Sequence, residues 1–125
     1  MIIRELNKAC GLALGIHVVW GMVPCPDNRP GCCAAHFGYS DDNGKPLPYY
    51  ATDPTATPIL LAEIERRGLQ ERYIGWFYKH VCTDGMNSRQ EVFAILRATP
   101  EQHARAFIQT IEWNEAISPA STPAP

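Results

Sequence analysis

The chain has 125 residues and a formal net charge of −2, and 46% of its residues are hydrophobic while 19% are charged. This composition is typical of one soluble globular domain. Because binding along a nucleic-acid backbone requires a basic surface, the charge balance argues against a direct nucleic-acid partner.

The start of the chain and its cysteine content indicate a compartment. Residues 1–15 include Arg4, Glu5 and Lys8 and lack the apolar core of a secretory leader. No apolar run approaches the ~18–20 residues of a membrane span. Five cysteines, an odd number, suit free thiols in a reducing compartment better than a disulfide scaffold. We therefore expect a cytoplasmic protein without membrane contact.

The first elements in chain order are predicted to be a helix and two strands. Apolar residues from Ile2 to Ala13 recur at spacings of three and four, which predicts an amphipathic helix over residues 2–14. Gly15 suits the cap that ends it. Residues 16–23 are β-branched and aromatic and stop at Pro24, and residues 32–39 form a second predicted strand.

A middle helix follows, with two candidate starting points. Asp53 before Pro54 places a side-chain acceptor at the cap and a proline at the first helical position, and Thr57 before Pro58 offers the same signal four residues later. Both starts remain open at this point. Gly68 is predicted to end the helix.

The last part of the chain is predicted to hold two more strands and a helix. Residues 72–82 and 90–98 are rich in aromatic and β-branched residues, and the segment between them has the composition of a hairpin connection. Thr99 and Gln102 then form a predicted capping box for a helix that runs to about residue 116. The tail, residues 118–125, is rich in Pro, Ser and Ala and is expected to be disordered.

The predicted order is α-β-β-α-β-β-α, in a single domain over residues 1–117. Two hairpins without a parallel crossover indicate an antiparallel sheet. Strands with apolar residues on both faces indicate helices on both sides. The expected fold is therefore α+β, a small α/β/α sandwich around about four mostly antiparallel strands.

Two segments of the chain resemble a known protein family. The segment that contains Tyr50, Ala51, Thr52 and Asp53 resembles the start of the middle helix in the phage ABA sandwich domain family. The last segment, ATPEQHARAFIQTIEW, is similar to that family's threonine-capped closing helix. The likeness covers residues 1–113, although Ala51 replaces the usual small hydroxyl residue and the cysteine-containing loop 24–31 is foreign to it. It implies a phage or prophage gene and a sandwich fold, and it transfers no catalytic residue.

The cysteine-rich stretch 25–36 raises the question of zinc. Zinc needs four ligands, usually supplied as closely spaced pairs, and no spacing here matches a standard zinc motif. Adjacent cysteines in a strand also face opposite sides of the sheet. We expect buried structural cysteines, with a zinc site as the alternative, and its candidate ligands are Cys25, Cys32, His36 and Cys82.

The aromatic stretch after residue 72 is the main candidate for recognition. Its rings either belong to the core between two helical layers or form a surface in which Tyr and Trp supply contact area with a polar tip. Nearby arginines can hold an anion or an acidic partner. The candidate binding residues are Tyr49, Tyr50, Arg72, Tyr73, Trp76, Tyr78, Arg89 and Arg97.

No pattern in the chain predicts catalysis or a cofactor, because no nucleophile elbow or glycine-rich phosphate loop is present. We expect a non-enzymatic, phage-type accessory protein that binds a bacterial host protein in the host cytoplasm. Its expected role is counter-defence, for example inhibition of a CRISPR complex. The alternatives are a protein that sequesters a small nucleotide signal and a zinc-stabilised structural module. Free sheet edges would also allow a homodimer.

Overall fold

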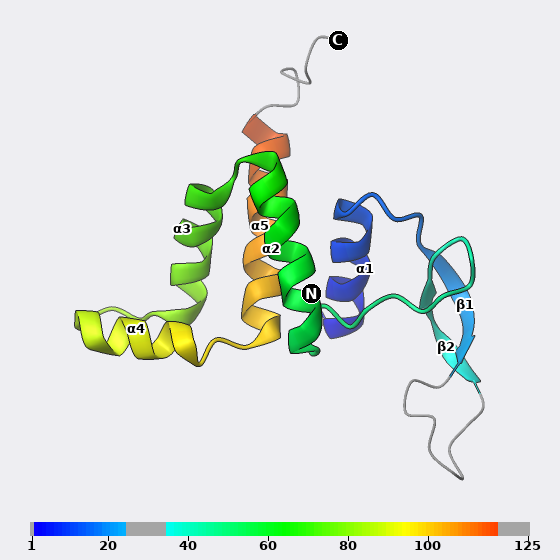
Figure 1. The fold of residues 1–125 in the computed structure, drawn as a ribbon, viewed down its shortest axis with the longest axis horizontal. Helices are drawn as coiled ribbons and strands as arrows, with labels where there is room; N and C mark the ends of the chain where they lie inside the picture. Colours follow the sequence, from blue (N-terminus) through cyan, green and yellow to red (C-terminus); the bar gives the residue numbers. More distant parts are fainter. Residues whose placement is uncertain (1, 25–34, 118–125) are drawn as a thin grey trace.

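Five helices and one β-hairpin make up the part of the chain that the structure, a computed structural model, describes: residues 2–24 and 35–117 (Figure 1). The order is α1 (Ile3–Ala13), β1 (Val19–Pro24), β2 (Ala35–Ser40), the 3₁₀ turn η1 (Pro54–Ala56), α2 (Thr57–Arg67), α3 (Gln70–Val81), α4 (Ser88–Leu96) and α5 (Pro100–Ile117). The fold is α+β, as predicted, and its sheet has two antiparallel strands. The predicted tail 118–125 lies outside the described residues.

Helix α5 is the central element, and α1, α2 and α3 all pack against it (Figure 1). Ala104, Ala106 and Phe107 on α5 are fully buried, together with Leu6 from α1 and Leu60 from α2. Alanines on the central helix let its neighbours approach closely, so that the larger side chains of those neighbours fill the space. The hydrophobic core is therefore a cluster of helices around α5.

The segment predicted as the best strand, residues 72–82, is helical. It forms α3, in which Tyr73, Phe77 and Val81 are buried at a spacing of four residues. Ile74 and Tyr78, which lie next to this buried stripe on the helix, are exposed. β-Propensity mainly reflects how a side chain packs, so an apolar stripe of helical period that faces α5 overrides it.

The second predicted strand, residues 90–98, is also a helix. Asn87 accepts a hydrogen bond from the Gln90 amide, and the Gln90 side chain accepts one from the Asn87 amide, each at 2.9 Å. This capping box starts α4. The predicted hairpin connection is instead an interhelical turn in which Gly85 has φ +89°. The four-stranded sandwich and the order α-β-β-α-β-β-α were therefore wrong, because both segments that would complete the sheet are helices.

The predicted helix boundaries are confirmed where capping residues define them. Asp53 accepts a hydrogen bond from the Thr55 amide and starts η1, as predicted. Helix α2 begins at the second candidate position, but Thr57 is its first helical residue and supplies no side-chain cap, since the cap residue is Ala56. Gly68 ends α2 at φ +69°. The Gln102 amide donates to the Thr99 hydroxyl at 3.2 Å, which is the predicted capping box.

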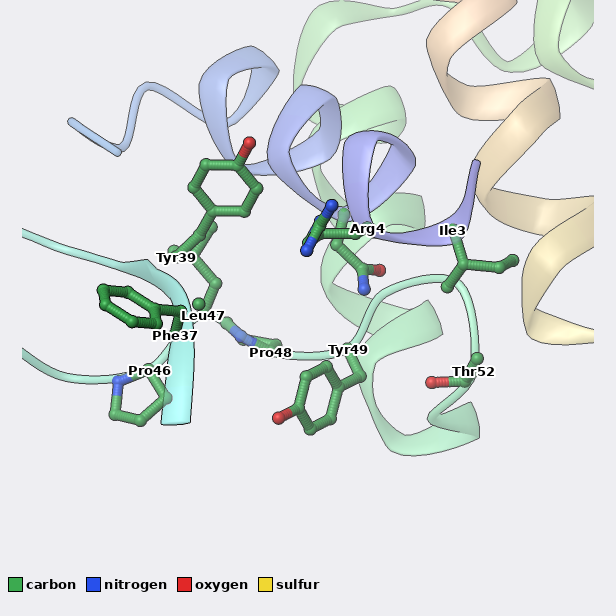
Figure 2. A pocket seen from close by; sticks show the side chains of 11 residues that line it. Ile3, Arg4, Phe37, Tyr39, Pro46, Leu47, Pro48, Tyr49 and Thr52 are labelled. Atoms are coloured by element: carbon green, nitrogen blue, oxygen red, sulfur yellow. The ribbon is translucent and has the colours of Figure 1, made fainter. Parts of the chain in front are cut away.

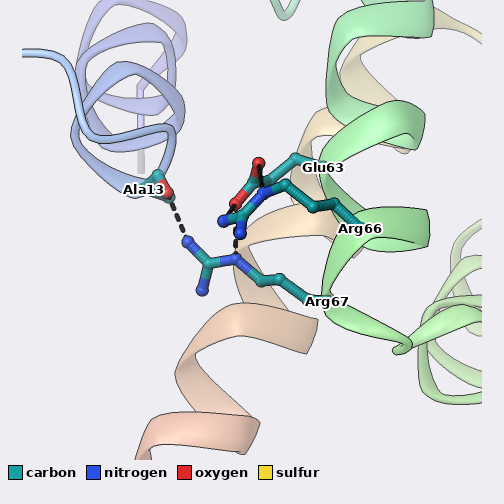
Figure 3. Close-up of polar contacts among 4 residues, drawn as sticks. All are labelled: Ala13, Glu63, Arg66 and Arg67. Carbon is teal, nitrogen blue, oxygen red and sulfur yellow. Dashed lines mark hydrogen bonds and ion pairs between the residues drawn. The ribbon is translucent and has the colours of Figure 1, made fainter.

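An arginine joins the end of α2 to the end of α1 (Figure 3). Arg67 donates to the backbone carbonyl of Ala13 at 2.7 Å and to Glu63 at 2.6 Å, and Glu63 also accepts from Arg66. Carbonyls at a helix end lack partners within the helix, and Arg67 supplies one. Hydrogen bonds from Arg66 and Arg67 lower the pKa of Glu63 to about 2.

The β-hairpin lies beside α1 and away from the rest of the bundle (Figure 1). Trp20 pairs with Tyr39, and Met22 with Phe37, so these four side chains share one face. The Tyr39 hydroxyl donates to Glu5 of α1 at 3.1 Å, and the Arg4 guanidinium lies 5.0 Å from the centre of the Trp20 ring. Helix α1 therefore holds the hairpin through polar and cation–π contacts.

Candidate functional site

A cavity of about 330 Å³ lies between the first turn of α1, strand β2 and the segment 46–52. Figure 2 shows its walls: side chains from all three segments surround the opening. We call this site the α1–β2 groove, and its principal lining residues are Ile3, Arg4, Phe37, Leu47, Tyr49 and Thr52.

The wall formed by residues 46–52 is fixed by backbone contacts. The Leu47 amide donates to the Tyr39 carbonyl at 3.1 Å, and the Ala51 amide donates to the buried Asn7 side chain at 2.9 Å. Leu47 is buried against α1 at Gly11, where an added Cβ would lie 3.1 Å from a Leu47 methyl carbon. Gly11 therefore permits the close approach that brings this wall against the helix.

The rim of the groove is apolar and aromatic, yet exposed. Phe37 is 63% exposed and Tyr49 is 39% exposed. Trp20 and Met22 extend the same exposed apolar surface along the hairpin. Contiguous exposed apolar surface on a small protein marks a site of interaction, and aromatic residues supply most of the binding energy at such sites.

Arg4 places a positive charge in the lining of the groove, and Lys8 lies outside that lining. Arg4 lies over the Trp20 ring, and the Lys8 ammonium lies 5.4 Å from the centre of the Tyr39 ring. Among the ion pairs of the described residues, none involves Arg4 or Lys8. Glu5 accepts from Tyr39, and burial together with this hydrogen bond raises the pKa of Tyr39. The groove can therefore receive an anionic group beside an apolar one.

The candidate binding residues from the sequence do not form one surface. Only Tyr49 lines the α1–β2 groove. Tyr50 and Tyr73 are core residues at 1% and 6% exposure, and burial raises the pKa of Tyr50 to about 12. The Tyr73 hydroxyl contacts Nδ1 of His103 at 2.5 Å, inside the bundle.

The other candidates are distributed over α3, α4 and the residues that follow them. The Arg72 guanidinium lies 4.0 Å from the Trp113 ring centre, and the Lys79 ammonium lies 4.4 Å from that of Trp76. Tyr78 is exposed on α3. Arg89 lies in the first turn of α4, while Arg97 follows α4 and stacks over Phe93.

The candidate zinc ligands are only partly within the described residues. Cys25 and Cys32 lie outside them, and His36 belongs to β2 without a described side chain. Cys82 is a free thiol at the end of α3. No group of three or more His, Cys, Asp or Glu side chains suited to a metal occurs in residues 2–24 and 35–117. The zinc alternative therefore stays a prediction.

Sequence reasoning missed Arg4 and Phe37 as site residues. Arg4 belonged to the polar side of a predicted helix, and Phe37 to a predicted strand, and neither pattern places them together. The signal that was available is Pro46-Leu47-Pro48 directly after a turn. Proline is confined to edge strands and strand ends, so two prolines around a leucine predict a short pairing at the sheet edge that the chain soon leaves.

Within the described chain, no helix has both the length and the apolarity needed to span a bilayer. Comparisons of the chain with protein-family models, curated proteins and solved structures find no match.

Proposed function

We propose that this chain is a non-enzymatic binding protein whose α1–β2 groove receives an acidic segment of a partner protein. The observation that carries the proposal is the position of Arg4, which lines an apolar cavity and has no ion pair among the described residues. An arginine beside exposed aromatic rings is typical of the centres of protein interfaces.

The proposed setting is a phage-type accessory role in the cytoplasm of a bacterial host, where the partner belongs to an immune system such as a CRISPR complex. The motifs around Tyr50–Asp53 and in the closing helix support it through their resemblance to the phage ABA sandwich domain family. Because α3 and α4 are helices where the sandwich would have strands, this setting depends on those motifs and on the exposed groove, not on a shared sheet.

A second candidate is a small nucleotide as the ligand. The cavity volume of about 330 Å³ falls within the range of small-molecule sites. Phe37 and Tyr49 would stack on a base, and Arg4 would face a phosphate. This candidate places the nucleotide at the α1–β2 groove and not at Trp76 and Tyr78, which lie on α3.

The test is capture from lysates of bacteria that carry defence systems, with the native chain and three variants. We expect Arg4→Glu and Phe37→Ala to lose at least about tenfold in captured partner, because each removes a central contact. Arg89→Glu, the same charge reversal on α4 at the far side of the bundle, should capture as much as the native chain. Equal capture by Arg4→Glu and native protein would reject the groove as the site.

The nucleotide candidate has its own measurement. A thermal-shift panel of linear and cyclic nucleotides should raise the unfolding temperature if one binds. A ligand at a hundred times its Kd adds about 2.7 kcal/mol of stability. An increase in unfolding temperature that is lost in Arg4→Glu would favour a nucleotide as the ligand. If no nucleotide raises the unfolding temperature, binding of a partner protein stays the proposed function.

A further inference from the structure

We infer that the partner segment binds as an extended strand, which pairs with the outer edge of β2 at Phe37 and directs an acidic side chain toward Arg4. This inference depends on the proposed function and adds the conformation and chemistry of the ligand. Addition of a strand to an open sheet edge is a general mode of peptide recognition, in which main-chain hydrogen bonds give affinity and side-chain pockets give specificity.

The direction of the Phe37 backbone groups follows from the hydrogen bonds of its neighbours in β2. The Tyr39 carbonyl accepts from the Leu47 amide at 3.1 Å, and the Asp41 amide donates to the Lys45 carbonyl at 2.9 Å. The backbone groups of Tyr39 therefore face away from β1. Because backbone direction alternates along a strand, the N–H and C=O of Phe37 face the same outer edge.

Proline supports the same alternation independently. Pro24 of β1 is opposite Ala35 in the register, and proline has no N–H to donate. It is therefore suited to a pair that exchanges no hydrogen bonds. The Met22–Phe37 and Trp20–Tyr39 pairs follow at intervals of two residues, so they are of this type as well.

Among residues 2–24 and 35–117, the segment that follows β2 does not cover this edge at Phe37. Ser40 pairs with Pro46, so in a continued strand Tyr49 would lie opposite Phe37. The Tyr49 carbonyl instead accepts from the amides of Thr52 and Asp53, at 3.0 and 2.8 Å. The chain has turned toward η1 at this point, and Phe37 is left 63% exposed. The pairing therefore ends before Phe37 and leaves the groove beside its edge.

The side chains of an added strand would have defined surroundings. Phe37 and Tyr39 point to the face on which Tyr39 contacts Glu5 of α1. Ligand side chains on that face, two positions apart, would lie toward Ile3 and Arg4. The lining of the groove therefore selects one apolar and one acidic residue with a single residue between them, in an extended peptide.

The experiment selects peptides from a display library of random linear decamers against the immobilised full chain. We expect enrichment of sequences with Asp or Glu two positions from an apolar residue. N-methylation of the enriched peptide, one residue at a time, should weaken binding about tenfold at the residue paired with Phe37, because it removes a main-chain hydrogen bond. At the neighbouring residues, whose N–H points away from β2, the Kd should stay within about threefold.

Protein variants provide the matched comparison. Phe37→Pro removes the outward N–H without removing a β1–β2 hydrogen bond, and Phe37→Ala removes only the ring. Met22→Pro makes the same backbone change at the cross-strand partner, on the opposite edge. We expect Phe37→Pro to bind about tenfold more weakly than Phe37→Ala, and Met22→Pro to bind as the native chain does. The N-methyl scan decides the question if a proline variant fails to fold.

The two proposals fail in different ways. If no N-methyl group weakens peptide binding, the proposed strand pairing is overturned. Loss of partner capture in Arg4→Glu would still support the groove as the binding site. If the library yields no enriched peptide but capture still depends on Arg4, the groove would bind a folded surface of the partner and not an extended segment. Capture that is independent of Arg4 would reject the proposed function itself.

Discussion

The side-chain oxygen of Asn7 accepts a hydrogen bond from the backbone amide of Ala51 at 2.9 Å, and both residues are buried. This contact joins α1 to a segment 44 residues later in the chain. It also fixes the wall of the α1–β2 groove that carries Leu47 and Tyr49. Asn7 therefore connects the stability of the fold with the shape of the groove.

Asn7→Ala should lower the free energy of unfolding by about 1–3 kcal/mol, because it leaves the buried Ala51 amide without an acceptor. Urea denaturation followed by circular dichroism measures the change. Asn43→Ala, at an exposed turn position, is the control and should stay within about 0.5 kcal/mol of the native chain. Equal effects of the two substitutions would contradict the structural role of Asn7.

Asn87→Ala should open α4 without unfolding the bundle. The substitution removes the capping box, and α4 has no buried residue to compensate for its loss. Hydrogen exchange of the amides in residues 88–96 should become faster while global stability stays nearly constant. Thr99→Ala at the start of the central α5 should instead lower global stability by about 1 kcal/mol. A global loss for Asn87→Ala would show that α4 belongs to the cooperative core.

Glu63→Gln should make the free energy of unfolding depend less on pH in the acidic range. The folded pKa of Glu63 is lowered from 4.5 to about 2, so its contribution is complete above pH 4.5 and is lost as the pH falls toward 2. Native and variant curves should differ at pH 7, by no more than about 1 kcal/mol because Arg66 is largely exposed, and converge near pH 2. Glu65→Gln, on the exposed side of α2, should leave the difference between pH 7 and pH 2 unchanged.

His103 should make the bundle less stable as the medium becomes acidic. Burial lowers its pKa below 6.5, so the unfolded chain takes up a proton before the folded chain does. Stability should be complete above pH 6.5 and fall as the pH drops through the folded pKa of His103. NMR titration gives that pKa, and urea unfolding at several pH values gives the slope. His103→Gln should reduce the slope; an unchanged slope would assign it to other groups.

The sequence predicted the helices that side-chain chemistry marks at their ends. Asp53, Gly68 and the Thr99–Gln102 box act locally, over three or four residues, so their effect does not depend on the rest of the fold. The Asn87–Gln90 box is of the same kind and was available in the sequence. It was overlooked because the residues after it, Val92 to Leu96, have β-forming character.

The helix α3 shows why the remaining fold was harder to predict. Tyr73, Phe77 and Val81 repeat every four residues, but the rings between them hide this period in an almost continuous apolar run. Such a run fits a strand buried on both faces as well as a helix. Only the presence of α5 on one side of α3 decides between them, and that contact is not local.

The groove could not be predicted from one segment of the sequence. Arg4, Phe37 and Tyr49 come from three elements, and each has an ordinary local explanation. Tyr49 was the only candidate binding residue that the fold brings to the groove. Tyr49 was predicted because its aromatic character is visible in the sequence. Arg4 and Phe37 were not, because their place in the groove depends on how the hairpin docks on α1.

The position of α5 among the elements has a consequence for how the molecule forms during synthesis. Helices α1, α2 and α3 leave the ribosome before α5, and each packs against it. Until residues 100–117 have emerged, the apolar sides of these earlier helices lack the element against which all three pack, and short helices alone are marginal in water. The bundle should therefore assemble only after residues 100–117 have left the ribosome.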